Sequence, residues 1–257
     1  MRIVLMLLLF TNLVKAEAIE DNSFLVEEAY NQEAGVVQFM SVYQKSKKQD
    51  DWSYTFINEI PVYSQNHQFS YELPVIHSAS PSQTELGDVK LNYRYEFFRS
   101  DKIVTTGRAS LITPTGKYDK GTGTGQFGSE VSLISSIVIS DRWVQHWNLG
   151  FGYTPKAKEQ GGQSADNSKY FLANSQVYLF SDHLNFMLET VMTSSETTIA
   201  EKKTEFGTDV IVSPSLRYAV DYKDWQFVPG FAIPTGVGPS AGDIQYLLYL
   251  SIEGKMF

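Results

Sequence analysis

Charged residues recur at alternate positions in strand-length stretches of this 257-residue chain. Lys90, Arg94 and Glu96 lie in the stretch 87–98, and Arg108 lies in the next stretch. Because successive side chains of a β-strand point to opposite faces, these four residues share one face of adjacent strands. Charges gathered on one face can select small solutes, or they can pair with one another as a structural network. The same face has further candidates: Glu59, Glu130, Glu189, Asp209 and Arg217, with Glu72, His146 and Glu253.

Arg94 and Arg108 lie at similar distances from an expected turn at 99–102. Antiparallel pairing about that turn brings both guanidinium groups to nearly the same depth. Two like charges at one depth repel each other unless carboxylates balance them. We expect acids close to this pair, with three candidates on the same face: Glu59, Glu130 and Asp209.

Three other patterns point to different chemistry, and each is weak. The run GTGQFG at 123–128 matches a dinucleotide-binding fingerprint, but the following SEVSLISSIVIS alternates as a strand, so a flexible loop is expected. His77 and Ser78 suggest a hydrolase, yet neighbours in sequence rarely pair as base and nucleophile. No catalytic residue and no cofactor are expected. The histidines have no ligand spacing, so no metal site is expected either; they are His67, His77, His146 and His183.

The elements that position these charges are about a dozen segments of alternating apolar and polar residues after Val36. In 224–234, for example, Trp225, Phe227 and Phe231 share one side, and the opposite side is small or polar. The same division occurs in four other segments: 67–76, 87–98, 142–154 and 243–254. The pattern predicts strands with one greasy face and one polar face.

The breaks between these segments alternate between short and long. The short breaks are 64–66, 100–101, 140–141, 181–182 and 222–223. The long breaks are 44–50, 77–86, 115–123, 155–167, 196–204 and 235–242. Strands that cross a bilayer up and down have tight periplasmic turns and longer external loops. The fold class predicted is all-β, a transmembrane antiparallel up-and-down β-barrel of about 12 strands with both termini periplasmic, in which the charged face lines the lumen.

A secreted soluble β-protein is the alternative, because its strands alternate too. Strand length favours lipid, since 205–221 exceeds the usual globular strand. Aromatic residues also flank both sets of breaks, for example Trp143 beside a short one and Trp52 beside a long one, as two interfacial girdles require. The final Phe257 resembles the terminal aromatic of outer-membrane proteins, although Lys255 replaces a usual apolar residue; it predicts contact with the barrel-assembly machinery.

The amino terminus predicts export. Arg2, the apolar run 3–10 and Ala16 are typical of a secretory signal peptide over 1–16, too short for a membrane anchor. The acidic segment 17–35 follows and could be a periplasmic latch, a luminal plug or a disordered leader. The barrel is expected over 36–257.

Composition limits the partners. The net charge is −8, and −10 once the two cations of the signal have left, which argues against nucleic acid. The chain has no cysteine, so disulfides and thiolate metal sites are excluded. The expected partners are outer-membrane lipid and a small-molecule permeant.

Two stretches resemble a known family. They are NSFLVEEAYNQEAGVVQF at 22–39 with NEIPVYSQNHQFSYELP at 58–74, and VSPSLRYAVDYKDWQFVPGFAIPTG at 212–236. They resemble outer-membrane transporters of the MetA-pathway-of-phenol-degradation family. The resemblance implies a barrel in the outer membrane of a Gram-negative bacterium that transports small compounds, among them aromatic or hydrophobic ones. It implies no catalytic residues.

The sequence therefore predicts a non-enzymatic outer-membrane channel for passive uptake of small molecules. An outer-membrane lipid hydrolase or acyltransferase is one alternative. A structural or adhesive barrel with a blocked lumen is another.

Overall fold

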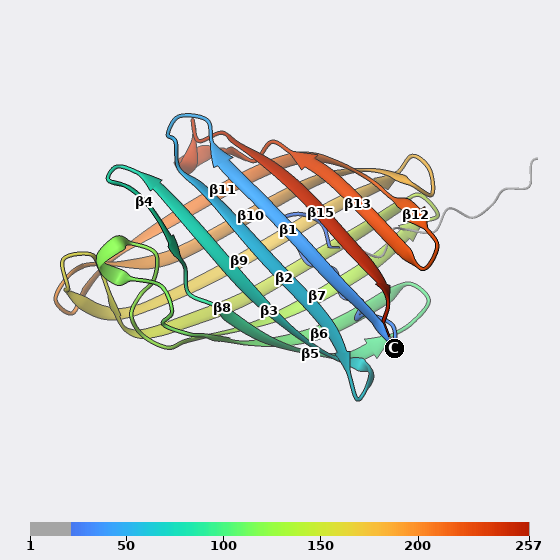
Figure 1. The fold of residues 1–257 in the computed structure, drawn as a ribbon, viewed down its shortest axis with the longest axis horizontal. Helices are drawn as coiled ribbons and strands as arrows, with labels where there is room; N and C mark the ends of the chain where they lie inside the picture. The colour runs from blue at the N-terminus through green and yellow to red at the C-terminus, as the bar shows by residue number, and fades with distance from the viewer. Residues whose placement is uncertain (1–21, 257) are drawn as a thin grey trace, which may run out of the picture.

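The computed structural model describes residues 22–256, and their strands close into an antiparallel barrel (Figure 1). Three of its strands are interrupted, at 87–89, at Ala219 and at 233–234, so fifteen segments form twelve strands, as predicted. The segments are β1 (Val36–Ser46), β2 (Trp52–Val62), β3 (Ser64–Ala79), β4 (Ser82–Leu86), β5 (Lys90–Arg99), β6 (Ile103–Ile112), β7 (Gly128–Ser140), β8 (Trp143–Lys158), β9 (Ser164–Leu179), β10 (Leu184–Ala200), β11 (Lys203–Tyr218), β12 (Val220–Tyr222), β13 (Trp225–Ala232), β14 (Thr235–Gly236) and β15 (Gln245–Lys255). Two short 3-10 helices lie in loops: η1 (Tyr118–Lys120) and η2 (Gly238–Ser240).

The first and last strands close the barrel. β1 pairs with β15 without a break, from Val36 opposite Lys255 to Ser46 opposite Gln245. Closure gives the edge groups of both strands partners, which a sheet needs in hydrocarbon because lipid offers no hydrogen bonds. No helix in the described part of the chain is both long enough and apolar enough to cross a membrane.

Side chains alternate between the two faces as predicted. Leu248 and Leu250 of β15 are exposed on the outside, whereas the intervening Tyr249 and the preceding Leu247 are buried inside. The same alternation places Trp147 and Leu149 of β8 outside. The greasy face is therefore the outer surface, and the polar face lines the lumen.

The strands extend further than predicted at the long-loop end. The expected loops 77–86, 155–167 and 196–204 are mostly hairpin: β3 pairs with β4, β8 continues to Lys158, and β10 continues to Ala200. These extensions are mainly polar on both faces, so they lack the regular alternation that identified the other strands, while backbone pairing is unaffected. At the opposite end the first turn also differs from the predicted one at 64–66. It lies at Tyr63, which has a left-handed φ of 60°, and 64–66 already belongs to β3.

The longest loop between described strands, 113–127, is held in shape by Asp88. Its carboxylate accepts hydrogen bonds from the backbone N–H of Gly116 and of Thr124, both at 2.9 Å. Lys117 of this loop pairs with Glu85 at 2.8 Å, and that carboxylate raises the pKa of Lys117. The glycine-rich run is thus part of an ordered loop that leads into β7 and not into a helix.

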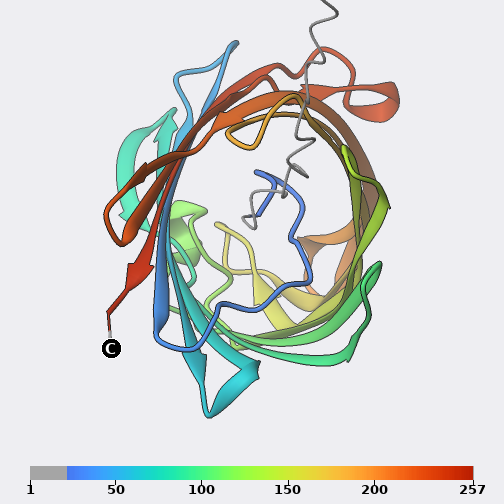
Figure 2. The same cartoon turned by 90° about the vertical axis from the view of Figure 1, so that its right-hand side faces the viewer.

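Residues 22–35, which precede β1, lie inside the barrel. Figure 2 looks along the barrel and shows residues 22–35 following the inner wall to the start of β1. We call these residues the luminal belt. The described part of the acidic segment therefore lies in the lumen.

The outer face yields a direct test. Leu248, 55% exposed near the middle of β15, contacts the hydrocarbon if the barrel spans a bilayer. Leu248→Arg should impair assembly by about 2–4 kcal/mol, measured as loss of the heat-modifiable band on gel electrophoresis. Gln245→Arg, on the inward face of the same strand, should be tolerated far better. Equal tolerance of both changes would contradict lipid exposure of this face.

Candidate functional site

The luminal belt passes successive strands of the barrel and is bound by one or two side chains on most of them. From the carboxyl end of the belt to its amino end, the side chains that form hydrogen bonds with it are Gln68 of β3, Arg94 of β5, Thr106 of β6, Ser136 of β7, Asn148 of β8, Glu189 of β10 and Arg217 of β11. These groups contact mainly the belt's backbone. The inner wall therefore acts as a receptor for an extended segment of chain.

Two neutral side chains show how the receptor works. Asn148 accepts from the N–H of Glu27 and donates to the carbonyl of the same residue, both at 2.8 Å, as a neighbouring strand would. Ser136 Oγ accepts from the N–H of Ala29 at 2.8 Å and lies 2.7 Å from His146 Nδ1. Backbone groups removed from bulk water need such partners, because an unpaired buried donor costs about 1–3 kcal/mol.

Arg94 and Arg108 lie directly opposite each other on β5 and β6, as predicted. Arg94 is 1% exposed, and its Nη2 donates to the carbonyls of Glu28 at 2.5 Å and Tyr30 at 3.2 Å. Its Nη1 lies 3.8 Å from the Glu59 carboxylate. Arg94 is thus mainly a clamp on the belt backbone.

Arg108 is the centre of the charged cluster. Its Nη2 lies 2.7 Å from Glu130 Oε1, and its Nη1 pairs with the carboxylate of Glu27. Glu130 also pairs with Lys169 of β9 at 2.5 Å and with Lys90 of β5 at 3.6 Å. A belt carboxylate therefore completes an ion-pair network on the wall.

Glu189 and Arg217 hold the other end of the belt. Glu189 is fully buried, and its Oε1 accepts from the N–H groups of Leu25 at 2.7 Å and Val26 at 3.1 Å. Arg217 Nη1 donates to the carbonyl of Asn22 at 2.9 Å. One oxygen of Glu189 accepts from two N–H groups, and the hydrogen bond from the cationic Arg217 is charge-assisted, so these residues are anchors.

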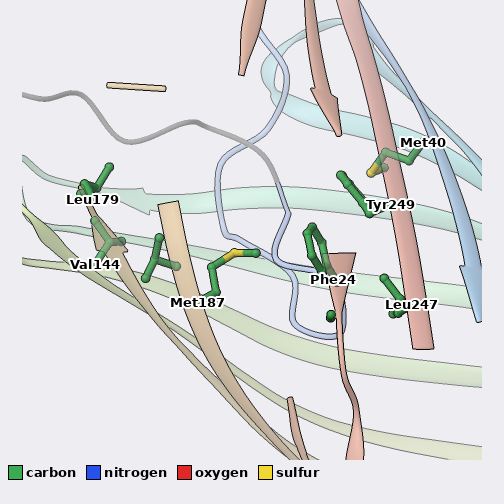
Figure 3. Close-up of a cluster of buried hydrophobic side chains, with 9 residues drawn as sticks. Phe24, Met40, Val144, Leu179, Met187, Leu247 and Tyr249 are labelled. Atoms are coloured by element: carbon green, nitrogen blue, oxygen red, sulfur yellow. The ribbon is translucent and has the colours of Figure 1, made fainter. Parts of the chain in front are cut away.

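One side chain of the belt, Phe24, packs among buried apolar side chains of the wall. The Phe24 ring stacks on Tyr249 with centroids 4.6 Å apart, and Figure 3 shows the two rings beside each other among the buried apolar side chains. Gly230 of β13 makes room for it, because a Cβ there would overlap the Phe24 ring.

The belt separates two cavities in the lumen. One, of about 230 Å³, extends toward the long-loop end and is lined by belt residues 22–27. The other, of about 270 Å³, lies on the opposite side between Glu28, Glu33 and Glu253. The belt thus divides the space inside the barrel.

The structure brings most of the predicted charges to this site but not all. Glu59, Glu130, Glu189, Arg94, Arg108 and Arg217 contact the belt or residues bound to it. Asp209 does not balance the arginines as expected; it accepts from Ser240 at 2.8 Å. Glu96 forms a two-point pair with Arg99 at 2.6 Å. Asp209 lies where β11 extends into the long-loop end, so sharing a face did not bring it to the same depth.

Sequence reasoning missed the neutral part of the receptor. Gln68, Thr106, Ser136 and Asn148 look like ordinary luminal residues, because a polar side chain facing water and one facing a peptide group have the same position in a strand. Glu27 was also missed as the partner of Arg108. The only signal was the absence of strand periodicity in 22–35 beside an inner wall rich in acceptors and donors.

The hydrolase candidates are not brought together. His77 and Ser78 are consecutive in β3 and point to opposite faces. His77 stacks on Trp52, and its Nδ1 lies 2.8 Å from Thr84 Oγ1. The imidazole is thus engaged by Trp52 and Thr84.

The barrel is similar to solved outer-membrane channels. The COG4313 outer membrane channel from Pseudomonas putida F1 matches with a TM-score of 0.70 and 10% identity, covering 88% of this chain and 97% of that one. The NanC porin matches with a TM-score of 0.57 and 10% identity, over 85% and 100% of the two chains. The KdgM porin gives a TM-score of 0.55 and 10% identity, over 86% and 99%.

The fold is that of outer-membrane channels and porins. At these identities the likeness establishes the fold alone. No family model and no curated protein matches the chain, so the family resemblance is not confirmed.

The anchors of the belt can be tested individually. Glu189→Ala leaves the N–H groups of Leu25 and Val26 without acceptors, so docking of the belt should weaken by about 1.5–3 kcal/mol. Glutamyl endopeptidase should then cleave after Glu27 and Glu28 at least about tenfold faster than in the parent barrel.

The matched control is Glu196→Ala, on the same strand but bound to Ser168 and Thr204 away from the belt. It should leave the cleavage rate unchanged. Equal protection of the belt in the Glu189 variant, with the barrel intact, would mean that the carboxylate does not anchor it.

Proposed function

We propose that this protein is a channel for passive uptake of small molecules through the outer membrane of a Gram-negative bacterium, and that the luminal belt restricts it. The observation that carries the proposal is the belt itself, held inside a closed barrel by hydrogen bonds from consecutive strands. A barrel built only as a scaffold needs no receptor for a separate chain segment. A channel that must open and close does.

The balance of forces supports a reversible belt. One hydrogen bond contributes about 0.5–1.5 kcal/mol net, while ordering one residue costs about 1–2 kcal/mol. Both terms have similar size in the belt, so its docking is weak compared with the barrel, whose strands pair continuously. The belt can leave the lumen without unfolding the wall.

In the proposed orientation the tight turns and both termini are periplasmic, and the long loops are external. The exposed apolar outer face then contacts outer-membrane lipid. The carboxyl-terminal segment, comprising β15 and the final Phe257 that lies outside the described residues, is the proposed contact for the barrel-assembly machinery. The permeants include aromatic or hydrophobic compounds, which can contact the apolar side chains packed around Phe24.

A disulfide can test whether the belt controls passage. Ser23 Oγ and Ser175 Oγ lie 2.8 Å apart, so cysteines at these positions should bond. The native chain has no cysteine that would interfere. In the oxidised Ser23→Cys/Ser175→Cys barrel, uptake of small neutral solutes by proteoliposomes should fall severalfold, and reduction should restore it.

Each single cysteine variant is the control and should respond to neither oxidant nor reductant. Identical uptake by the oxidised and reduced double variant would exclude movement of the belt. A parent protein that takes up no solute and carries no current in a planar bilayer would contradict the channel and favour a blocked structural barrel.

A further inference from the structure

The 230 Å³ cavity beside the belt has two unlike walls. On one side are apolar side chains of β1, β2 and β15 with the first residues of the belt: Met40, Val42, Ile57, Tyr249, Phe24 and Leu25. Such a wall suits a small hydrocarbon or aromatic body. A 150 Å³ cavity is known to hold benzene, so this volume has room for a ring or a short alkyl chain with a polar head.

The other wall is charged, and the belt supplies one of the carboxylates that neutralise its cations. The barrel supplies three cations, Lys90, Arg108 and Lys169, but only two acids, Glu72 and Glu130. The third carboxylate at the cavity is Glu27 of the belt, which pairs with Arg108. If the belt leaves, the wall keeps one uncompensated positive charge.

Two of the three cations are accessible parts of the barrel's side of this wall, whereas Arg108 is buried. The side chains of Lys90 and Lys169 are 25% and 39% exposed, whereas that of Glu130 is 2% exposed and engaged by Arg108 and Lys169. Glu72 accepts from Asn92 at 3.0 Å. A molecule entering the cavity therefore meets ammonium groups before it meets a free carboxylate.

We propose that this cavity binds small amphipathic anions, and that Glu27 occupies the place of their carboxylate. The head of the ligand pairs with Arg108, Lys90 and Lys169, and its apolar body lies against Met40, Ile57 and Tyr249. Binding displaces Glu27 from Arg108 and thereby loosens the belt at its charged contact. This inference names a substrate class for the channel proposed above and rests on that proposal.

The test measures binding at equilibrium, independently of conduction. The full-length protein in phosphatidylcholine nanodiscs is titrated at pH 8 by calorimetry with octanoate, with octanol and with octylammonium, and empty nanodiscs are subtracted. Octanoate should bind at least about tenfold more tightly than either analogue of the same chain length, since it alone carries a negative charge that pairs with Arg108, Lys90 and Lys169.

Two variants make the prediction specific. Glu27→Gln removes the competing carboxylate and should tighten octanoate binding by about threefold or more, a gain that misfolding cannot produce. Glu33→Gln makes the same charge change at an exposed position of the belt and should have no effect. Lys90→Gln/Lys169→Gln should weaken octanoate binding by about tenfold and leave octanol binding unchanged.

Octanol or octylammonium binding as tightly as octanoate would overturn the proposal. So would an unchanged or weaker affinity for octanoate in Glu27→Gln. Octanoate binding by a barrel that transports nothing would refute the proposed function but leave this site standing. Solute uptake without octanoate binding would do the reverse.

Discussion

The structure depends on the pairing of a polar inner wall with the backbone of one segment of chain. A closed barrel directs half of its strand side chains into a narrow interior, where polar groups need partners. In this lumen the belt supplies peptide N–H and C=O groups to Arg94, Asn148 and Glu189. In return those side chains satisfy a backbone that has no strand beside it. Without the belt, the polar side chains of the wall lose these hydrogen-bond partners, and so does the belt backbone without the wall. Water has to replace the missing partners in either case.

That constraint also explains the lumen's division into charged and apolar sectors. The charged sector on β5, β6, β7 and β9 holds Glu27 of the belt through Arg108. The apolar sector on β13 and β15 holds Phe24 in the notch at Gly230. A segment fixed at both sectors crosses the passage between them. In the proposed channel, a permeant competes with these contacts or passes beside them.

Much of the fold could be predicted because the strands of a membrane barrel alternate between apolar outward residues and polar inward residues. The period of two placed Leu248 outside and Arg94 inside, and the turn at 99–102 predicted that Arg94 faces Arg108. This alternation is lost where both faces of a strand are in contact with water. There the sequence predicts loops, whereas the structure has the hairpin β3–β4 and the outer part of β10.

The belt's path could not be predicted for a different reason. Its partners are neutral side chains such as Ser136 and Asn148, whose positions indicate only that they face inward. The segment itself has no periodicity that fixes its direction. Which carbonyl meets which arginine is decided by tertiary packing alone.

The central claim is that the luminal belt limits passage through the barrel. Its most direct test is the single-channel conductance, in planar bilayers, of the full protein and of a form lacking residues 22–33, both heat-modifiable. We expect the conductance to rise severalfold on deletion, because the two cavities beside the belt then join. Equal conductance of the two forms would contradict the account.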